Sequence, residues 1–186
     1  MGISIKSNGA FEQLRKKLTA EKGKKVEIGF FDSKKATIAS YLEYGWVQRI
    51  TPKQAGYFRG IHRVNLKAGN TLYMPPRPFM RGTFEAKHKE WIGLAQKFFK
   101  NRLDVNATLE ILGNRAVEDI QASILKGGTG KEQFAPRSPL TMALIEANLK
   151  DENHKTDGTP NTSQTTKPLY RSGSLFSALT FRMVDK

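Results

Sequence analysis

The side chains that could do chemistry in this sequence are few, and the most suggestive of them form a glycine-rich segment. The sequence GGTGK at residues 127–131 resembles a phosphate-binding loop. Such a loop needs a glycine five residues before its last glycine and a serine or threonine after its lysine. Leu125 and Glu132 occupy those two places. The segment also follows a predicted helix rather than a strand, so we interpret these glycines as a helix stop with a flexible turn.

The other reactive side chains do not converge in the sequence. The chain has 3 histidines, which are far apart, and no cysteine that could supply a thiolate to a metal. Ser172 and Ser174 flank Gly173 without the Gly-x-Ser-x-Gly frame of a nucleophile elbow. Glu118 and Asp119 are neighbours that point about 100° apart on a helix, so they form no convergent carboxylate pair. We predict no catalytic residue, no metal site and no cofactor.

Charge is the strongest chemical signal in the sequence. The net charge is +14, and the segment from Tyr44 to Phe84 contains no acidic residue. A polyanion such as DNA, or an acidic protein surface, is the natural partner of such a segment, although a solvated face that aids solubility is the alternative. We predict that five basic residues face that partner: Arg49, Lys53, Arg59, Arg63 and Lys67.

Length and composition indicate one domain over residues 1–186. A chain of 186 residues with 38% hydrophobic residues matches a single ordinary core. No apolar stretch approaches the roughly 18 to 20 residues of a membrane-spanning helix, so we predict no membrane partner. The absence of cysteine excludes disulfides and fits a reducing cytoplasm.

Hydrophobic periodicity predicts the elements of the first part of the chain. Residues 9–22 have the spacing of a short amphipathic helix, and residues 26–30 alternate as a half-buried strand. Asp32 or Ser33 can cap a second helix that ends at Gly45. Residues 47–73 are expected to form a long basic excursion, as a loop or a hairpin, with strand-like patches at 57–64 and 71–74.

Two long helices are predicted next. Apolar residues recur every three or four positions over 79–102 and give that helix one broad apolar face. Asn106 is the expected cap of the following helix, which ends at Gly127. A short helix begins at Ser138, an exposed polar loop spans 151–166, and a helical turn and a strand close the chain. The predicted fold is α+β, with a small antiparallel sheet packed against several helices.

Several blocks, taken in order, resemble the tail-completion and virion-morphogenesis proteins of long-tailed bacteriophages, a family of minor tail or neck proteins. The similarity covers nearly the whole chain and is carried by order more than by any single block. Serine at position 172, where the family usually has threonine, and the long basic segment before Met74 are departures. The blocks are KVEIGFF at 25–31, ASYLEYG at 39–45, MPPRPFMR at 74–81, PRSPLTMALI at 136–145 and KPLYRSGSLFSALTFRMV at 167–184.

The resemblance implies a non-enzymatic structural protein of the virion, made in the host bacterial cytoplasm and located at the neck or the top of the tail. It implies a ring of identical copies, hexameric by expectation, that joins tail to head and contacts neighbouring neck and tail proteins, with packaged DNA as a further partner. A tail terminator, a sequence-independent nucleic-acid-binding protein and an enzyme such as a nuclease are the alternatives. The partner interface is predicted at Glu43, Tyr44, Gly45, Pro75, Pro76, Arg77, Pro78 and Phe79.

Overall fold

The computed structural model describes residue 16 and residues 23–62, 64–101, 104–142, 167–170 and 173–185. The predicted fold class is confirmed: the described part of the chain is α+β, with two small antiparallel sheets and a pair of long helices in contact. The predicted polar loop at 151–166 and, apart from residue 16, the predicted helix at 9–22 lie outside the described residues.

The first sheet joins the two ends of the described chain. β1 (Lys25–Gly29) pairs antiparallel with β4 (Thr180–Val184), and both strands were predicted. On the outer face Glu27 stands opposite Arg182, whose guanidinium donates to Glu27 Oε2 at 2.9 Å. Hydrogen bonds from Lys25 and Arg182 lower the pKa of the Glu27 carboxyl. This exposed cluster favours the register of the sheet, because a one-residue slip would separate the charges.

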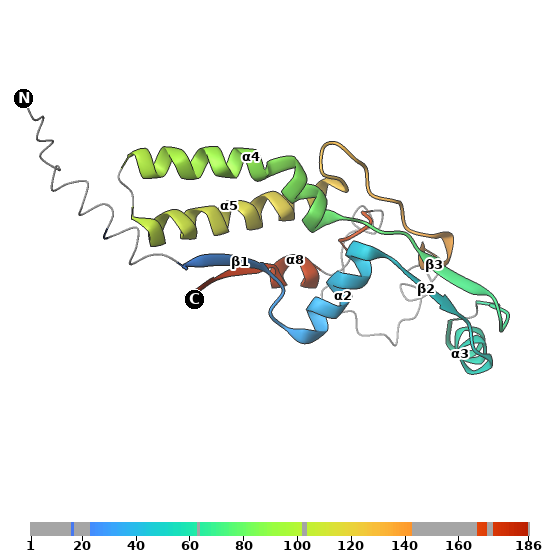
Figure 1. Cartoon of the computed structure of the whole chain (residues 1–186). Helices are drawn as coiled ribbons and strands as arrows, with labels where there is room; N and C mark the ends of the chain where they lie inside the picture. Colours follow the sequence, from blue (N-terminus) through green and yellow to red (C-terminus); the bar gives the residue numbers. More distant parts are fainter. Residues whose placement is uncertain are drawn as a thin grey trace, which may run out of the picture.

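The two long helices, α4 (Phe79–Lys100) and α5 (Val105–Lys126), lie side by side. α5 lies between α4 and the β1–β4 sheet, so the body has three layers (Figure 1). The prediction of Asn106 as the cap of α5 is wrong. Asp104 is the cap and accepts from the backbone N–H of Asn106 at 3.0 Å, because its carboxylate lies just ahead of the first helical turn.

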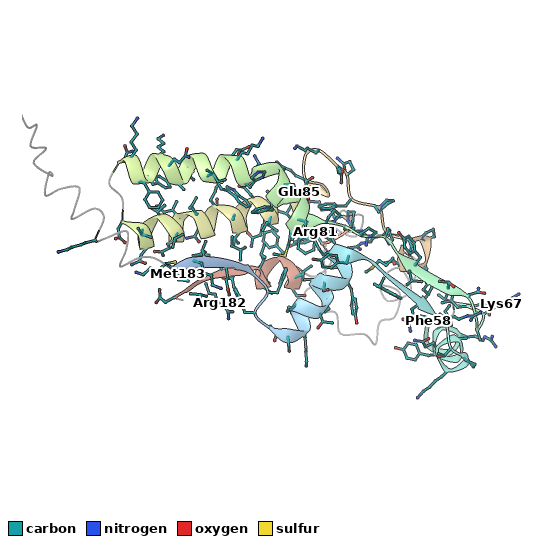
Figure 2. The ribbon with its side chains drawn as sticks, in the orientation of Figure 1. Phe58, Lys67, Arg81, Glu85, Arg182 and Met183 are labelled. Carbon is teal, nitrogen blue, oxygen red and sulfur yellow. The ribbon has the colours of Figure 1, made fainter. Side chains whose placement is uncertain are left out.

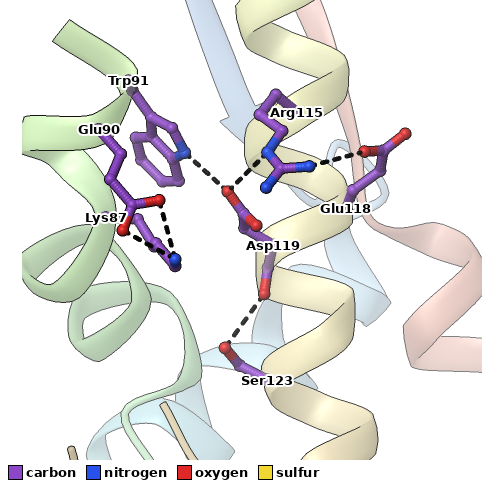
Figure 3. A network of polar contacts seen from close by, with 7 residues as sticks. All are labelled: Lys87, Glu90, Trp91, Arg115, Glu118, Asp119 and Ser123. Carbon is purple, nitrogen blue, oxygen red and sulfur yellow. Dashed lines mark hydrogen bonds and ion pairs between the residues drawn. The ribbon is translucent and has the colours of Figure 1, made fainter. Parts of the chain in front are cut away.

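A polar network ties α4 to α5 (Figure 3). The indole Nε1 of Trp91 donates to Asp119 Oδ2 at 2.8 Å, and Arg115 Nε lies 3.3 Å from the same oxygen. The hydroxyls of Thr83 and Ser123 are hydrogen-bonded at 2.7 Å in the buried part of the interface. Asp119 is therefore engaged in holding the two helices together.

The core lies where the start of α4 meets the end of α5. Phe79 and Ile124 are fully buried there, and the remaining core side chains come from separate parts of the chain. α2 (Ser33–Tyr44) and α8 (Ser174–Ala178) contact each other beside this core. Asp32 caps α2 by accepting from Lys35 N at 2.9 Å, as one of the two predicted caps. The other core residues are Ala39, Ile120, Phe134, Leu169, Leu175 and Leu179.

We expect Gly113→Ala to destabilise the body. A Cβ at Gly113 on α5 would lie 2.5 Å from Cδ2 of the Phe181 ring on β4. Overpacking of this kind costs about 1 to 3 kcal/mol, and most of that range exceeds the roughly 1 kcal/mol that alanine gains over glycine in a helix. Gly93→Ala on α4 is the control, because nothing lies within 4 Å of its added Cβ. Thermal melts should show a lower Tm for the first variant and an equal or higher Tm for the second.

The second sheet belongs to a projecting unit that we call the arm, residues 46–74. β2 (Trp46–Arg49) pairs antiparallel with β3 (Thr71–Met74), so the hairpin form of the predicted basic excursion is confirmed. α3 (Pro52–His62) follows β2 and precedes β3 in the chain. The strand-like interpretation of 57–64 is therefore wrong over the residues that α3 includes. The arm extends from the end of the body near α2 (Figure 1).

Candidate functional site

The predicted basic residues lie together on the arm. Arg49 ends β2, Lys53 and Arg59 lie on α3, and Lys67 lies in the segment that leads to β3; all four are exposed. Arg63 lies outside the described residues. Figure 2 places Lys67 and Phe58 at the far end of the molecule from Arg182 and Met183. The charge therefore stands away from the body, where a partner can reach it.

A capping box builds the helix of the arm. The backbone N–H of Gln54 donates to Thr51 Oγ1 at 3.2 Å, and Gln54 Oε1 accepts from the backbone N–H of Thr51 at 3.0 Å. Pro52 occupies the first helical position, where a missing N–H has no cost. Ile50, which follows β2, and Ala55, on α3 itself, are both buried.

The two faces of the hairpin differ. Trp46, Leu72 and Met74 line a mostly apolar cavity of about 470 Å³ against the body. Val47 and Tyr73 form a cross-strand pair and are 66% and 62% exposed, and Tyr73 also lines this cavity. Tyr57 on α3 is also exposed. The arm thus offers exposed aromatic rings among its cations, a combination that suits both nucleic acid and protein partners.

A buried carboxylate fixes the base of the arm to α4. Glu43 is the penultimate residue of α2 and is 4% exposed. Its two oxygens accept from the backbone N–H groups of Met80 and Arg81, each at 2.9 Å. These amides belong to the first turn of α4, which has no side-chain cap of its own. A carboxylate at a helix N-terminus is also favoured by the helix dipole. Glu43 therefore works as a long-range cap.

A buried guanidinium makes the second attachment. Arg77 is 4% exposed, and its Nε and Nη2 donate to the carbonyls of Ala135 and Pro136 at 2.7 and 2.8 Å. The backbone N–H of Arg77 donates to Leu42 O at 2.8 Å. Burial lowers the pKa of the Arg77 guanidinium. Arg77 thus joins α2, the start of α4 and the segment after α5.

Gly45 and Tyr44 complete this joint. Gly45 has a left-handed φ of 72°, and a Cβ there would lie 2.5 Å from Met74 O and 2.8 Å from Pro76 N. Only glycine allows that approach of the two strands. The Arg81 guanidinium lies 4.6 Å from the centre of the Tyr44 ring, which is 63% exposed. We call Glu43, Gly45 and Arg77 the clamp.

The predicted partner interface maps onto the clamp and its surroundings. Glu43, Arg77 and Phe79 are buried within the chain, Tyr44 and Pro76 are exposed, and Pro75 and Pro78 are half-buried. The structure thus gives the buried members an internal role. The exposed members, Tyr44 and Pro76, are accessible to a partner. Their contact with a partner stays a prediction.

The described residues contain no group of three or more His, Cys, Asp or Glu side chains that could hold a metal ion. Within the same residues no helix is long and apolar enough to cross a membrane. The clearest chemical feature is the arm, which can form sequence-independent contacts to phosphate or charge pairs with an acidic protein.

The comparisons with family models, curated proteins and solved structures found no match. The sequence did carry a signal for α3 that the interpretation above missed, namely Thr-Pro-Lys-Gln at 51–54, which is a capping box with proline at the first helical position. The capping role of Glu43 had no local signal, because its partners are more than thirty residues away.

Proposed function

We propose that this chain is a non-enzymatic structural component of a tailed bacteriophage virion, which forms a ring at the neck or the top of the tail and helps to join tail to head. In this role the arm is held by the clamp at a fixed angle to the body. Its cations meet packaged DNA or an acidic neighbouring protein.

The proposal depends mainly on one observation. The sequence blocks that resemble the tail-completion family contact one another in the folded chain. The first block forms β1 and pairs with β4 of the last block. Glu43, from the second block, caps the helix that starts in the third block, and Arg77 of the third block binds Pro136 of the fourth. Blocks far apart in the sequence thus support one another in one fold, as expected if they were selected together.

The arm favours the second candidate function, sequence-independent binding of nucleic acid outside a virion. Five basic residues and no acidic residue lie within 46–74, and the exposed tyrosines offer rings on which bases can stack. The two functions differ in oligomeric state, because a neck protein must close a ring whereas a simple DNA-binding protein need not.

Native mass spectrometry and negative-stain electron microscopy of the purified full chain test the proposal. We expect a closed ring, with six copies as the expected stoichiometry. Virions labelled with an antibody to this chain should carry the label at the neck or the top of the tail. A chain that stays monomeric and is absent from virions, yet binds free DNA, would contradict the proposal and support the second candidate.

A further inference from the structure

The outer edge of β3, the side turned away from β2, is open. The two strands form a sheet of their own, and the described residues place no third strand beside them. The backbone N–H of Ile50 donates to Asn70 O at 2.8 Å, so the ladder continues through a hydrogen-bonded pair there. Because such pairs alternate along an antiparallel ladder, the N–H and C=O groups of Thr71 and Tyr73 point outward. These groups have no backbone partner among the described residues.

An apolar cleft of about 470 Å³ lies beside this open edge, between the arm and the body. β3 lines it with the consecutive residues Leu72, Tyr73 and Met74, whereas β2 contributes only Trp46. The rest of the lining comes from α2, from α8 and from the segments that precede α8. The apolar side chains of the body in the cleft include Ile38, Leu42, Leu140, Leu169 and Leu175. We call this space the arm–body cleft.

An open strand edge beside an apolar cleft determines the form of the occupant. Backbone donors and acceptors on an edge pair with an extended polypeptide, which adds to the sheet as another strand. Alternate side chains of the added strand point to the same face of the sheet, so one set can enter the cleft. Duplex DNA has no run of backbone amides that could continue the ladder. The occupant is therefore an extended polypeptide with apolar side chains at alternate positions.

Charge determines the remaining positions of the occupant. Arg77 and Arg137 line the cleft, and no Asp or Glu side chain of the described residues does so. Arg77 donates to the neutral carbonyls of Ala135 and Pro136, so these bonds do not balance its positive charge. The arm adds five basic residues and no acidic residue over 46–74. An acidic segment is attracted to this surroundings, whereas a second copy of a chain with a net charge of +14 is disfavoured.

We propose that the arm–body cleft binds an extended acidic segment of a neighbouring protein, which adds to the outer edge of β3 as a third strand. The cations of the arm attract the segment, the backbone of Thr71 and Tyr73 sets its register, and the cleft holds its alternate apolar side chains. The inference rests on the proposed function for the identity of the neighbour as a virion protein. It assigns the acidic partner of the arm a binding site and a binding mode. A single copy contains the whole site, so binding is measured separately from ring formation.

The first test uses a labelled peptide of sequence DVDLDVD, in which apolar and acidic residues alternate. Fluorescence anisotropy with the purified full chain should show binding that is about tenfold or more tighter than that of the scrambled peptide DDDVLVD, because only the alternating sequence directs its apolar side chains to one face. The charge-inverted peptide KVKLKVK should not bind. Failure of DVDLDVD to bind, or equal binding of the scrambled peptide, would overturn the inference.

Proline substitutions test whether the peptide adds to the edge of β3. Tyr73→Pro removes an outward N–H, which an edge strand tolerates because that group is not part of the ladder. Tyr73→Ala removes the ring and keeps the N–H. We expect Tyr73→Pro to bind DVDLDVD about five- to tenfold more weakly than Tyr73→Ala does, as the loss of one hydrogen bond implies. Val47→Pro removes the matching N–H from the outer edge of β2 and should bind the peptide as the wild type does. Equal affinities of the two Tyr73 variants would contradict strand addition.

Hydrogen exchange of the wild-type chain, followed by NMR, gives a readout that needs no substitution. The Tyr73 amide should exchange rapidly in the free chain and about tenfold or more slowly with saturating DVDLDVD, while the Val47 amide stays rapid. Slow exchange of Tyr73 in the free chain would show that the chain itself covers this edge, and bound peptide that leaves Tyr73 rapid would exclude strand addition; either result overturns the inference. A chain that binds the peptide by these criteria and forms no ring contradicts the proposed function alone.

Discussion

The variant R49Q/K53Q/R59Q/R63Q/K67Q is expected to keep the fold and to lose most of its affinity for polyanions. Each phosphate that a basic residue neutralises contributes about 0.9 to the slope of log K against log salt. Five such contacts give a slope of about 4.5, so the wild type should lose several hundredfold in affinity between roughly 50 and 200 mM salt. The variant should bind weakly at both salt concentrations. Fluorescence anisotropy with a labelled mixed-sequence duplex measures both slopes.

A matched control separates the place of the charge from its amount. K34Q/K89Q/K97Q/K100Q/K126Q removes five exposed lysines from α2, α4 and α5 and leaves the arm unchanged. We expect this control to keep most of the wild-type salt slope. Equal losses in the two variants would show that the arm is an ordinary solvated face. If the wild type does not bind DNA and only the arm variant fails to join heads to tails, the partner is an acidic protein.

The sequence predicted correctly those helices and strands whose ends are set by residues within about one turn, such as a cap or a glycine. Asp32 and Gly45 delimit α2 as expected, because a cap and a left-handed glycine act over one turn. The strands β1 and β4 followed from alternation alone, although their pairing joins opposite ends of the described chain. The predicted cap, Asn106, misses the observed cap, Asp104, by two residues, and both residue types are good caps.

The arm shows where periodicity misleads. The alternation at 57–64 suggested a strand, but the capping box of Thr51 and Gln54, with Pro52 between them, starts a helix at the end of β2. The capping pair satisfies the backbone N–H groups at the start of the helix. A strand at 57–64 would instead need a neighbouring strand for its N–H groups, and β2 and β3 already pair with each other. Start signals therefore outweigh a short alternation in a segment this isolated.

The clamp and the exposed apolar side of α4 could not be predicted from local sequence, for another reason. The sequence predicted a broad apolar face on α4, but only packing determines which part of it α5 covers. Glu43 could have been an exposed helix-end residue, and its burial depends on α2 reaching the start of α4. Tertiary contacts of this kind convert a residue from a surface candidate into a structural one.

Glu43→Ala is expected to cause the largest stability loss among single substitutions at the clamp. The change leaves the backbone N–H groups of Met80 and Arg81 without their acceptor and removes the partner of the Arg81 side chain, which lies 3.1 Å from Glu43 Oε1. Loss of a buried, hydrogen-bonded charge costs about 3 kcal/mol. For a chain of this size each kcal/mol lowers the Tm by about 2 to 4 °C, so the loss should be roughly 6 to 12 °C.

Two further variants separate the loss of the buried cap from the loss of a carboxylate in general. Glu43→Gln keeps the shape and one acceptor oxygen, so it should lose only about 1 to 2 kcal/mol. Glu85→Ala removes an exposed carboxylate from the same helix and should stay within about 0.5 kcal/mol of wild type. Because Glu43 also sets the direction of the arm, hydrogen exchange in β2 and β3 should rise in Glu43→Ala at temperatures well below its Tm. The prediction is contradicted if Glu43→Ala has the same Tm as Glu85→Ala and if its β2 and β3 amides exchange as slowly as in the wild type. That result would show that Arg77 and Gly45 hold the arm in place without Glu43.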